Sequence, residues 1–423
     1  MPSKEPRLLA WTRAFDGFGA MMLLQAIYLT GALVSAPVET SAQNTPPSQP
    51  PALSFSLAPP KQKGGTYVGD ETCAGCHQDK AISYHKTAHA ITSSHPSQSS
   101  IGGSFDSGLN ILRTVNPDLY FEMEANEKGF FQTAKARLPD SRTLFRTERI
   151  DVVIGSGRKG QTYLFWDGDQ LFELPVSYWT EGRKWVNSPS YPDGTASFER
   201  PVHPRCLECH VSNFASQAPP VNSFNKPSLV LGLACEKCHG PGSEHVARFR
   251  SNPLPSPSPA SGIINPAKLS RERQIEVCKL CHAGIGTSLT PPLTFVPGAS
   301  LAKHLVFEKA KPGARIDAHS GQIQLLERSK CYQSSPTMTC ATCHDVHQPQ
   351  RDLAAFATKC LTCHQVESCR NFPVLGHKID RQCITCHMPA ETTDQIISSA
   401  NGLSMQPKVR NHQIGIYPDA VLP

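Results

Sequence analysis

The chain repeats one short cysteine–histidine motif seven times. In each repeat two cysteines are separated by two residues, and the second is followed directly by histidine. Numbered 1 to 7 in chain order, the motifs are Cys73/Cys76/His77, Cys206/Cys209/His210, Cys235/Cys238/His239, Cys278/Cys281/His282, Cys340/Cys343/His344, Cys360/Cys363/His364 and Cys383/Cys386/His387. Two thiols at this spacing can add across the two vinyl groups of one haem, and the adjacent imidazole then reaches the iron. The motifs therefore predict seven covalently bound haem c groups, with these histidines as proximal iron ligands.

Zinc sites and disulfides are the alternatives for so many cysteines. Zinc takes four ligands, and an odd number of Cys-x-x-Cys pairs does not close into sites. Neither alternative explains the histidine that follows every pair. The motifs use 14 of the 16 cysteines and leave Cys331 and Cys369. In an oxidising compartment these two are expected to form a disulfide, and the alternative is two buried free thiols.

The remaining histidines are candidates for the sixth iron ligand. Of 17 histidines, seven are proximal and ten are left, whereas the whole chain holds 7 methionines. Distal histidine is therefore favoured over distal methionine, and bis-His ligation lowers the reduction potential. The predicted distal ligands are His89, His245, His347, His412, His203, His319 and His377. For each of them the alternative is a surface histidine or one that binds a propionate.

Two of these histidines stand close behind a motif. His245 follows His239 by six residues, and His347 follows His344 by three. Such a short connection does not easily cross the porphyrin of the same motif. Both are therefore expected to ligate a neighbouring haem.

The spacing of the motifs indicates how the chain is organised. The first cysteines of motifs 1 and 2 are 133 residues apart, and the later intervals are 29, 43, 62, 20 and 23 residues. So few residues per haem predict a haem-packed fold, mainly α and irregular, with a small antiparallel β-rich insertion. The expected segments are a signal peptide (1–42), a flexible linker (43–65), a first haem segment (66–99), the β-rich insertion (100–200) and a six-haem domain (201–423).

Local patterns predict three elements. A helix is expected over residues 79–92, with His85 and His89 on one face. One hairpin is expected between residues 119–124 and 129–136. A second is expected from residue 161 to 178, turning at Asp167-Gly168. The simplest interpretation of the β-rich insertion is that it covers the first haems. The alternatives are a lid or a partner-docking surface.

The N-terminal residues resemble an export signal. Basic residues precede an apolar run, and small residues at 40–42 offer a cleavage site. A periplasmic or otherwise exported location is expected. Membrane attachment is expected only if the segment is uncleaved, since the run is at the lower edge of spanning length. The formal charge of +6 is offset by haem propionates, so no nucleic-acid partner is expected.

Several stretches resemble a known family of multihaem cytochromes. The family includes the tetrahaem cytochrome of ammonia oxidisers, pentahaem nitrite reductase and octahaem hydroxylamine oxidoreductase. The chain looks most like exported multihaem proteins of environmental bacteria, often fused to tetratricopeptide repeats. The matching residues are 67–73, 86–90, 154–157, 174–178, 235–245, 265–269, 338–347 and 383–389. The resemblance implies a haem-packed fold and strengthens His89, His245 and His347 as distal ligands.

The resemblance leaves two functional hypotheses. The first is an electron-transfer protein that exchanges electrons with redox proteins or quinol-linked donors. The second is an oxidoreductase that acts on a small nitrogen or sulfur compound, of the nitrite or hydroxylamine type, at one haem with an open sixth position. The Cys-x-x-Cys-Lys motif that marks the active haem of pentahaem nitrite reductase does not occur in this sequence. Electron transfer through mostly bis-His haems is the favoured hypothesis.

Overall fold

The computed structural model describes residues 65–217, 219–251, 262–311 and 313–418. The predicted signal peptide and nearly all of the linker lie outside these residues. Ser56–Pro423 form one compact unit. The predicted division of this unit into a first haem segment, a β-rich insertion and a six-haem domain stays a prediction.

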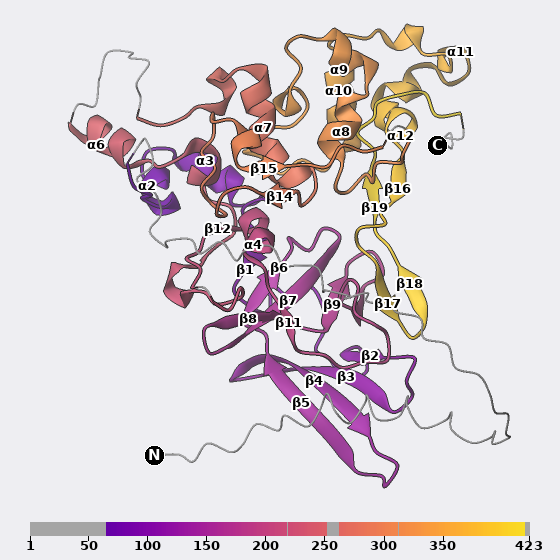
Figure 1. The fold of residues 1–423 in the computed structure, drawn as a ribbon. Helices are drawn as coiled ribbons and strands as arrows, with labels where there is room; N and C mark the ends of the chain where they lie inside the picture. The colour runs from indigo at the N-terminus through magenta and orange to yellow at the C-terminus, as the bar shows by residue number, and fades with distance from the viewer. Residues whose placement is uncertain (1–64, 218, 252–261, 312, 419–423) are drawn as a thin grey trace, which may run out of the picture. The chain divides into compact units, whose positions relative to one another are not determined.

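Helix and strand occur in similar amounts. The described residues are about 27% helix and 23% strand, a mixed content that does not clearly bear out the predicted mainly α fold. The longest helix of the described residues has 12 residues, because the segments between motifs are short. Figure 1 shows the strands as long magenta arrows, whereas the helices of the later motifs are short orange and yellow coils.

Two antiparallel sheets form the strand-rich part. The four-stranded sheet has the order β2-β3-β4-β5, with β2 Ile111–Arg113, β3 Leu119–Asn126, β4 Gly129–Arg137 and β5 Thr143–Arg149. The seven-stranded sheet has the order β1-β6-β7-β8-β11, and β9 pairs with both β7 and β10. Its strands are β1 Ser93–Ser94, β6 Val152–Ile154, β7 Gly160–Asp167, β8 Gln170–Glu173, β9 Val176–Trp179, β10 Lys184–Asn187 and β11 Arg200–Pro201.

Both predicted hairpins are present. Strand β3 pairs with β4 down to Asn126 opposite Gly129. Strand β7 pairs with β8, and Asp167 lies opposite Gln170. The turn of this second hairpin is therefore Gly168-Asp169, one residue later than the predicted Asp167-Gly168. Gly168 has a φ of +62°, a backbone conformation that glycine adopts without strain.

A buried glutamine joins the two sheets. Gln132 on β4 is fully buried. Its amide nitrogen donates to the carbonyl of Val176 on β9 at 2.7 Å, and its amide oxygen accepts from the N–H of Val176 at 3.1 Å. The side chain thus links strands of different sheets. It pairs both backbone groups of Val176, which would lower the stability of the fold if they were buried without a partner.

Replacing Gln132 by methionine should destabilise the strand-rich part. The shape of the side chain is nearly kept, but both backbone groups of Val176 lose their partner inside the protein. The expected loss is about 2–4 kcal/mol of unfolding free energy, measured by chemical denaturation followed through tryptophan fluorescence. The exposed Gln98 provides the matched control, and an equal loss in Gln98→Met would contradict the interpretation.

Short helices carry most of the motifs. The α-helices are α2 Asp70–Ala74, α3 Gln78–Tyr84, α4 Pro204–His210, α5 Glu236–His239, α6 Ser243–Ser251, α7 Arg271–His282, α8 Gln322–Glu327, α9 Lys330–Ser334, α10 Leu353–Cys360, α11 Phe372–Leu375 and α12 Cys383–His387. The 3₁₀ helices are η1 Lys226–Ser228, η2 Pro266–Lys268, η3 Leu301–Lys303, η4 Cys340–Thr342, η5 Val366–Ser368 and η6 Gly376–Arg381. Side chains of Ser270 and Asp352 cap α7 and α10 by accepting backbone N–H groups.

Small two-stranded ladders connect these helices. They are β12 Val211–Asn213 with β13 Val230–Leu231, β14 Thr287–Ser288 with β15 Leu305–Val306, β16 Ala390–Thr392 with β19 Lys408–Arg410, and β17 Ser398–Ala400 with β18 Leu403–Met405. Two contacts tie the strand-rich part to the later segments. Asn187 donates to the Ser399 hydroxyl at 3.2 Å, and Arg158 donates to the carbonyl of Gln350 at 2.9 Å.

The predicted helix over residues 79–92 is too long. Helix α3 ends at Tyr84, and His85 is its C-cap. The buried Thr87 then donates its N–H to the carbonyl of Tyr84 at 2.8 Å and reverses the chain. His85 and His89 therefore do not share a helical face.

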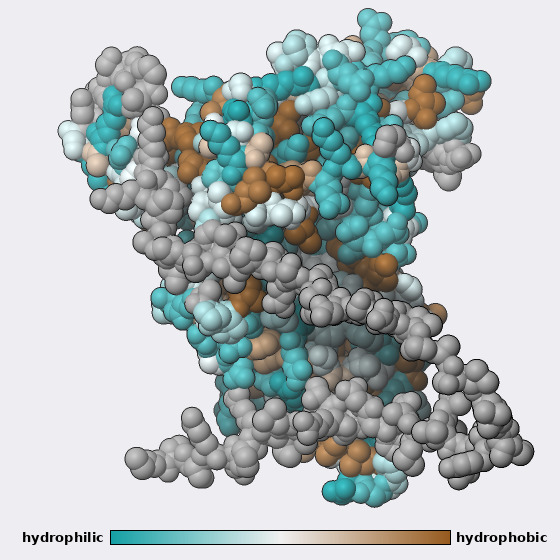
Figure 2. Space-filling model, in the orientation of Figure 1, coloured by the Kyte–Doolittle hydropathy of each residue, from teal (hydrophilic) through white to brown (hydrophobic). Residues whose placement is uncertain are grey.

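No helix in the described part of the chain is both long and apolar enough to cross a bilayer. Figure 2 shows hydrophilic residues over much of the face it draws, with apolar residues in separate groups.

Candidate haem sites

The motifs fold locally as turns of helix. In motifs 1, 3, 5 and 6 the histidine N–H donates to the carbonyl of the first cysteine, at 2.9, 3.1, 2.9 and 3.0 Å respectively. Residues at positions i, i+3 and i+4 of a helical turn lie on one face. The two thiols and the imidazole of a motif are therefore presented together, as attachment to one porphyrin requires.

Motif 7 coincides with helix α12, which begins at Cys383 and ends at His387. Cys383 and Cys386 are both half-buried, and the two thiols interact electrostatically. Like the other motif cysteines, Cys386 is a free thiol in the structure and forms no disulfide. Its covalent bond to haem therefore stays a prediction from the sequence motif.

Four proximal histidines face a second histidine from another part of the chain. The ring centres and planes are separated by 6.3 Å and 19° for His77 and His245, 6.1 Å and 24° for His239 and His347, 6.4 Å and 28° for His344 and His412, and 6.1 Å and 76° for His282 and His89. The second members are the four sixth-ligand candidates best placed by the sequence, and their ligation of iron stays a prediction.

These separations fit an iron between the two rings. Two metal–nitrogen bonds of about 2.0 Å, with about 1.1 Å from each nitrogen to its ring centre, sum to about 6 Å. All four pairs have this spacing, although they come from unrelated sequence intervals. The donor set is therefore suited to six-coordinate haem iron held by two imidazoles.

Hydrogen bonds orient several of these rings. The Nδ1 atoms of His239 and His387 lie 2.8 and 2.7 Å from the carbonyls of Ile264 and Gly415. A carbonyl accepts, so Nδ1 carries the proton, and the lone pair of Nε2 is left for a metal. The Nδ1 of His412 lies 3.1 Å from the carbonyl of Arg410 in the same way. Nδ1 of His210 lies 3.1 Å from the Thr92 hydroxyl.

Burial favours the neutral form of several of these rings, which is the form that binds metal. Burial, together with the nearby His89, lowers the pKa of His282 to about 4. Burial is also the main cause that lowers the pKa of His89, His344 and His412. Neutral imidazoles at neutral pH are ready to donate a lone pair to iron.

The cysteines of different motifs lie close together. The thiols lie close enough to interact in three pairs, which are Cys73 and Cys235 (motifs 1 and 3), Cys209 and Cys281 (motifs 2 and 4), and Cys278 and Cys340 (motifs 4 and 5). Electrostatic interactions link Cys238 with Cys278 (motifs 3 and 4), Cys343 with Cys360 (motifs 5 and 6), and Cys360 with Cys383 (motifs 6 and 7). The spatial order of the motifs therefore differs from their order in the sequence.

An arginine fixes motif 2 against motif 4. Arg205 donates to Glu208 at 2.8 Å, to the carbonyl of Leu280 at 2.6 Å and to that of Ile285 at 2.8 Å. The Arg205 and Glu208 side chains are 12% and 5% exposed, so solvent screens this ion pair little. Lys237 of motif 3 interacts with Glu208 and Cys281. Motifs 2, 3 and 4 thus meet at one charged cluster.

Two carboxylates attach the first haem segment to motif 3, and the sequence analysis missed both. Glu236 is 3% exposed and accepts the N–H groups of Val68, Gly69 and Gly242 at 2.8–3.1 Å. Asp70 accepts the N–H of Cys235 at 2.8 Å. For Glu236, the sequence signal was an acidic residue between the two cysteines of a motif. A charge at that position needs a hydrogen-bonding partner when the motif is buried.

Three predicted distal ligands are not in such ring pairs within the described residues. His203 is the exposed N-cap of α4. His377 is exposed, lies 3.2 Å from Asp380 through Nδ1, and packs its ring on Phe372. His319 interacts with His210 and His282. The structure thus favours His319 of these three, because it alone of them interacts with a proximal histidine.

The predicted disulfide between Cys331 and Cys369 stays a prediction. Both residues are half-buried free thiols in the structure, as the motif cysteines are. Cys331 lies near Cys343 and Cys360, whereas Cys369 lies near Cys383.

Part of the chain matches a family of haem proteins. Residues 183–240, which contain motifs 2 and 3, match the family described as cytochrome c554 and c-prime. The C-type polyheme cytochrome OmcC of Geobacter sulfurreducens is 28% identical over 230 residues. The match covers 47% of this chain and 28% of that protein, so the chain spans just over a quarter of that relative.

Two solved structures are similar in outline. The outer cell wall cytochrome OcwA has a TM-score of 0.49 at 17% identity, covering 82% of this chain and 79% of that one. An undecahaem cytochrome from the S-layer of Carboxydothermus ferrireducens has a TM-score of 0.38 at 16% identity, covering 78% of this chain and 52% of that one.

The sequence matches do not distinguish between branches, so a closer relation to the ammonia-oxidiser or nitrite reductase proteins stays a prediction. The repeated motifs and the matched sequences point in the same direction. Over these residues the chain is similar to multihaem c-type cytochromes.

Proposed function

We propose that the chain is an exported heptahaem c-type cytochrome that transfers electrons through mostly bis-His haems. Haem iron supplies the chemistry by cycling between its ferric and ferrous forms. The protein supplies two cysteines and a proximal histidine at each of the seven motifs. At four motifs a second histidine lies opposite the first. This set of opposed imidazoles is the observation that carries the proposal, since such ligation leaves no vacant position for a substrate.

The proposed relay is branched. The contacts between cysteines run from motif 1 to motif 3, then to motifs 4, 5, 6 and 7, and motif 2 joins at motif 4. The order of the motifs along the relay and the position of the branch are both inferred from these contacts between cysteines. Buried Arg205 and Glu208 hold the branch in place at motif 4.

Exposure supports entry and exit at the outer motifs. The exposed cysteines of the described residues are Cys76, Cys206 and Cys363, which belong to motifs 1, 2 and 6. Motifs 3, 4 and 5 lie inside the proposed relay. Electrons are thus expected to enter or leave near motifs 1, 2 and 6, from redox proteins or quinol-linked donors in the periplasm or outside the cell.

A second function is favoured by one observation. His210, His364 and His387 are in none of the imidazole pairs within the described part of the chain. A haem held there with an open position could act on a small nitrogen or sulfur compound, as in the nitrite or hydroxylamine reactions. Catalysis at iron requires such a displaceable position.

Haem content and spin state of the purified ferric protein test the proposal. Seven haems per chain are expected from a pyridine haemochrome assay combined with protein mass. The electron paramagnetic resonance spectrum is expected to be mostly low-spin and unchanged by nitrite, hydroxylamine or cyanide. A high-spin signal that nitrite or hydroxylamine converts would favour the oxidoreductase, and fewer than seven haems would contradict the proposed count.

A further inference from the structure

Strand β5 forms one edge of the four-stranded sheet and pairs with β4 on its other side (Figure 1). Just beyond its two ends, the carbonyl of Arg142 accepts the N–H of Leu138, and the N–H of Ile150 donates to the carbonyl of Phe130. Backbone groups alternate between the two sides of a strand, and the register with β4 is continuous. The even-numbered residues of β5 therefore face β4. The outward N–H and C=O groups belong to Thr143, Phe145, Thr147 and Arg149.

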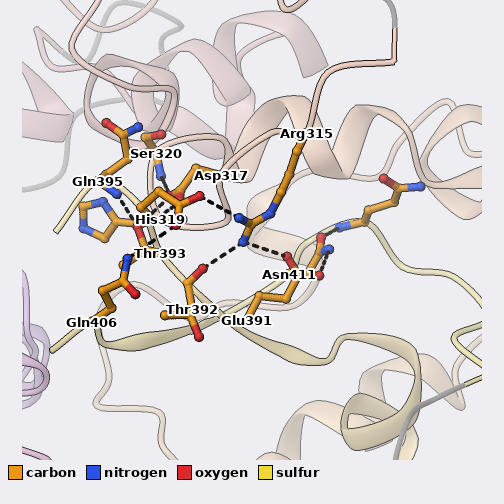
Figure 3. A network of polar contacts seen from close by, with 12 residues as sticks. Arg315, Asp317, His319, Ser320, Glu391, Thr392, Thr393, Gln395, Gln406 and Asn411 are labelled. Carbon is orange, nitrogen blue, oxygen red and sulfur yellow. Dashed lines mark hydrogen bonds and ion pairs between the residues drawn. The ribbon is translucent and has the colours of Figure 1, made fainter. Parts of the chain in front are cut away.

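These outward backbone groups have no hydrogen-bonding partner among the described residues. The β16–β19 ladder differs, because a loop covers the edge of β16. Asp317 accepts the N–H of Asp394 at 2.7 Å, and Arg315 donates to the carbonyl of Thr392 at 2.8 Å (Figure 3). Strand β5 also lacks proline, lysine and a bulge, which edge strands commonly use against pairing. Its edge is therefore open to another strand.

The side chains of β5 carry opposite charges two residues apart. Arg146 and Glu148 lie on the same face, with 3.2 Å between Nε and Oε1. Their side chains are 33% and 27% exposed, so both charges reach solvent at the edge. On the opposite face Phe145 is 70% exposed. A strand with this pattern is complementary in charge to an antiparallel copy of itself.

One antiparallel register of two β5 strands satisfies both the backbone groups and the charges. With Thr147 on the two-fold axis, Arg146 of each copy lies opposite Glu148 of the other. Phe145 then lies opposite Arg149, an arrangement in which a guanidinium can pack on the aromatic ring. The outward N–H and C=O groups of Phe145, Thr147 and Arg149 all find partners in the second copy.

Neighbouring registers are less favourable. A two-fold axis at Arg146 would place the two arginines opposite each other, and an axis at Glu148 would do the same for the two glutamates. An axis at Phe145 would place Glu148 opposite Arg142. That arginine lies beyond the end of β5 and already donates to Asp140 at 2.7 Å.

We propose that two copies of this chain pair through β5 and join their four-stranded sheets into one continuous sheet, with Thr147 on the two-fold axis. The contact is a single strand edge, so the dimer is small in area and in equilibrium with the monomer. Strand β5 contains no haem motif, and the pairing uses none of the residues that attach haem. It holds whether or not the proposed function is correct.

Sedimentation velocity of the purified full-length protein, over a range of concentrations, tests the pairing. Thr147→Pro removes the N–H on the axis, and proline is tolerated in an edge strand. The dissociation constant of the dimer should rise at least about tenfold. Thr143→Pro also removes an outward N–H, but outside the paired residues, and should leave the dissociation constant unchanged.

Three results of this measurement would overturn the proposal. They are a wild-type protein that is monomeric at every concentration, a dimer that Thr147→Pro does not weaken, and a dimer that Thr143→Pro weakens equally. The last of these would exclude the register with Thr147 on the axis.

Charge reversal tests the same register without changing the backbone. Arg146→Glu places only negative charges opposite each other, and Glu148→Arg places only positive ones, so each variant alone should be monomeric. In an equal mixture of the two variants the opposed charges differ again, and a dimer with one copy of each should form. Native mass spectrometry identifies this mixed dimer by its mass. A mixture that stays monomeric, at concentrations where the wild type is dimeric, contradicts the register.

Hydrogen exchange shows what covers the edge. The amides of Phe145, Thr147 and Arg149 should exchange slowly in the wild-type dimer and quickly in the monomeric Arg146→Glu variant. Slow exchange at these amides in a monomeric wild type would mean that another segment of the chain covers β5, and the proposal would be wrong.

Discussion

Replacing Cys278 and Cys281 by alanine is expected to cut the haem of motif 2 off from the rest of the relay. These two cysteines are proposed to attach the haem of motif 4, where contacts from motifs 2, 3 and 5 meet. Without this haem, motif 2 loses the contact between Cys209 and Cys281 that joins it to the relay. Motif 3 stays linked to motif 5, because His347 follows motif 5 by three residues and faces His239 of motif 3.

A photosensitiser attached at one end measures this effect. The exposed Lys80 lies three residues after His77 of motif 1. It can be changed to cysteine for coupling, in a background with Cys331 and Cys369 replaced by serine. With dilute protein and a sacrificial donor, the intact relay should become fully reduced. In the variant, five of the six remaining haems should be reduced quickly, and the haem of motif 2 should be reduced slowly.

The matching substitution at motif 2 is the control. With Cys206 and Cys209 changed to alanine, all six remaining haems should still be reduced quickly, because motif 2 is a side branch at motif 4. A relay that followed sequence order would behave differently. Loss of motif 2 would then isolate the haem of motif 1, and fast reduction of a single haem would contradict the branched order.

Much of the chemistry was readable from local sequence. A Cys-x-x-Cys-His motif spans one helical turn, so it can be recognised from consecutive residues without knowledge of the fold. The hairpins were readable for the same reason, because turn residues and alternating side chains are local signals. His245 and His347 were readable because a short connection to their own motif excluded the same haem.

The spatial order of the motifs was not readable from sequence. It depends on contacts such as Cys209 with Cys281, between residues more than seventy positions apart. A single sequence holds no signal for such pairs when no alternating or helical pattern connects them. The balance of helix and strand could not be predicted for a related reason, since closely spaced haems would take the place of the side-chain core that long helices otherwise form.

The helix expected over residues 79–92 shows how tertiary contacts override a periodic pattern. The spacing of His85 and His89 suited a helix, but the hydroxyl of Tyr84 donates to the carbonyl of Leu233 at 2.7 Å. The carbonyl of His89 accepts the N–H of Leu233 at 3.1 Å. Both bonds fix the segment to the residues before motif 3, and the chain turns at Thr87 to reach them. His89 then faces His282, a position that a continued helix would not give.

The buried carboxylate of Glu236 should have the largest effect on stability of any single side chain in motif 3. It accepts three backbone N–H groups, from Val68, Gly69 and Gly242. Glutamine offers one oxygen and directs its amide group toward donors, so at least one N–H loses its partner. Glu236→Gln is therefore expected to cost about 1–3 kcal/mol, the penalty for an unsatisfied buried group.

Because of where Glu236 lies, Glu236→Gln should change the haem spectrum as well as the unfolding free energy. The spectrum distinguishes a local effect on His245 from general destabilisation. Val68 and Gly69 precede motif 1, and Gly242 precedes His245, the histidine that faces His77. Loosening both sides of this pair should let His245 leave the iron, so Glu236→Gln should also show a high-spin fraction of one haem. Glu244→Gln, an exposed change in the same segment, should keep both the wild-type unfolding free energy in chemical denaturation and the low-spin spectrum. A stability loss without any high-spin haem would mean that the carboxylate holds the segment together but does not position His245.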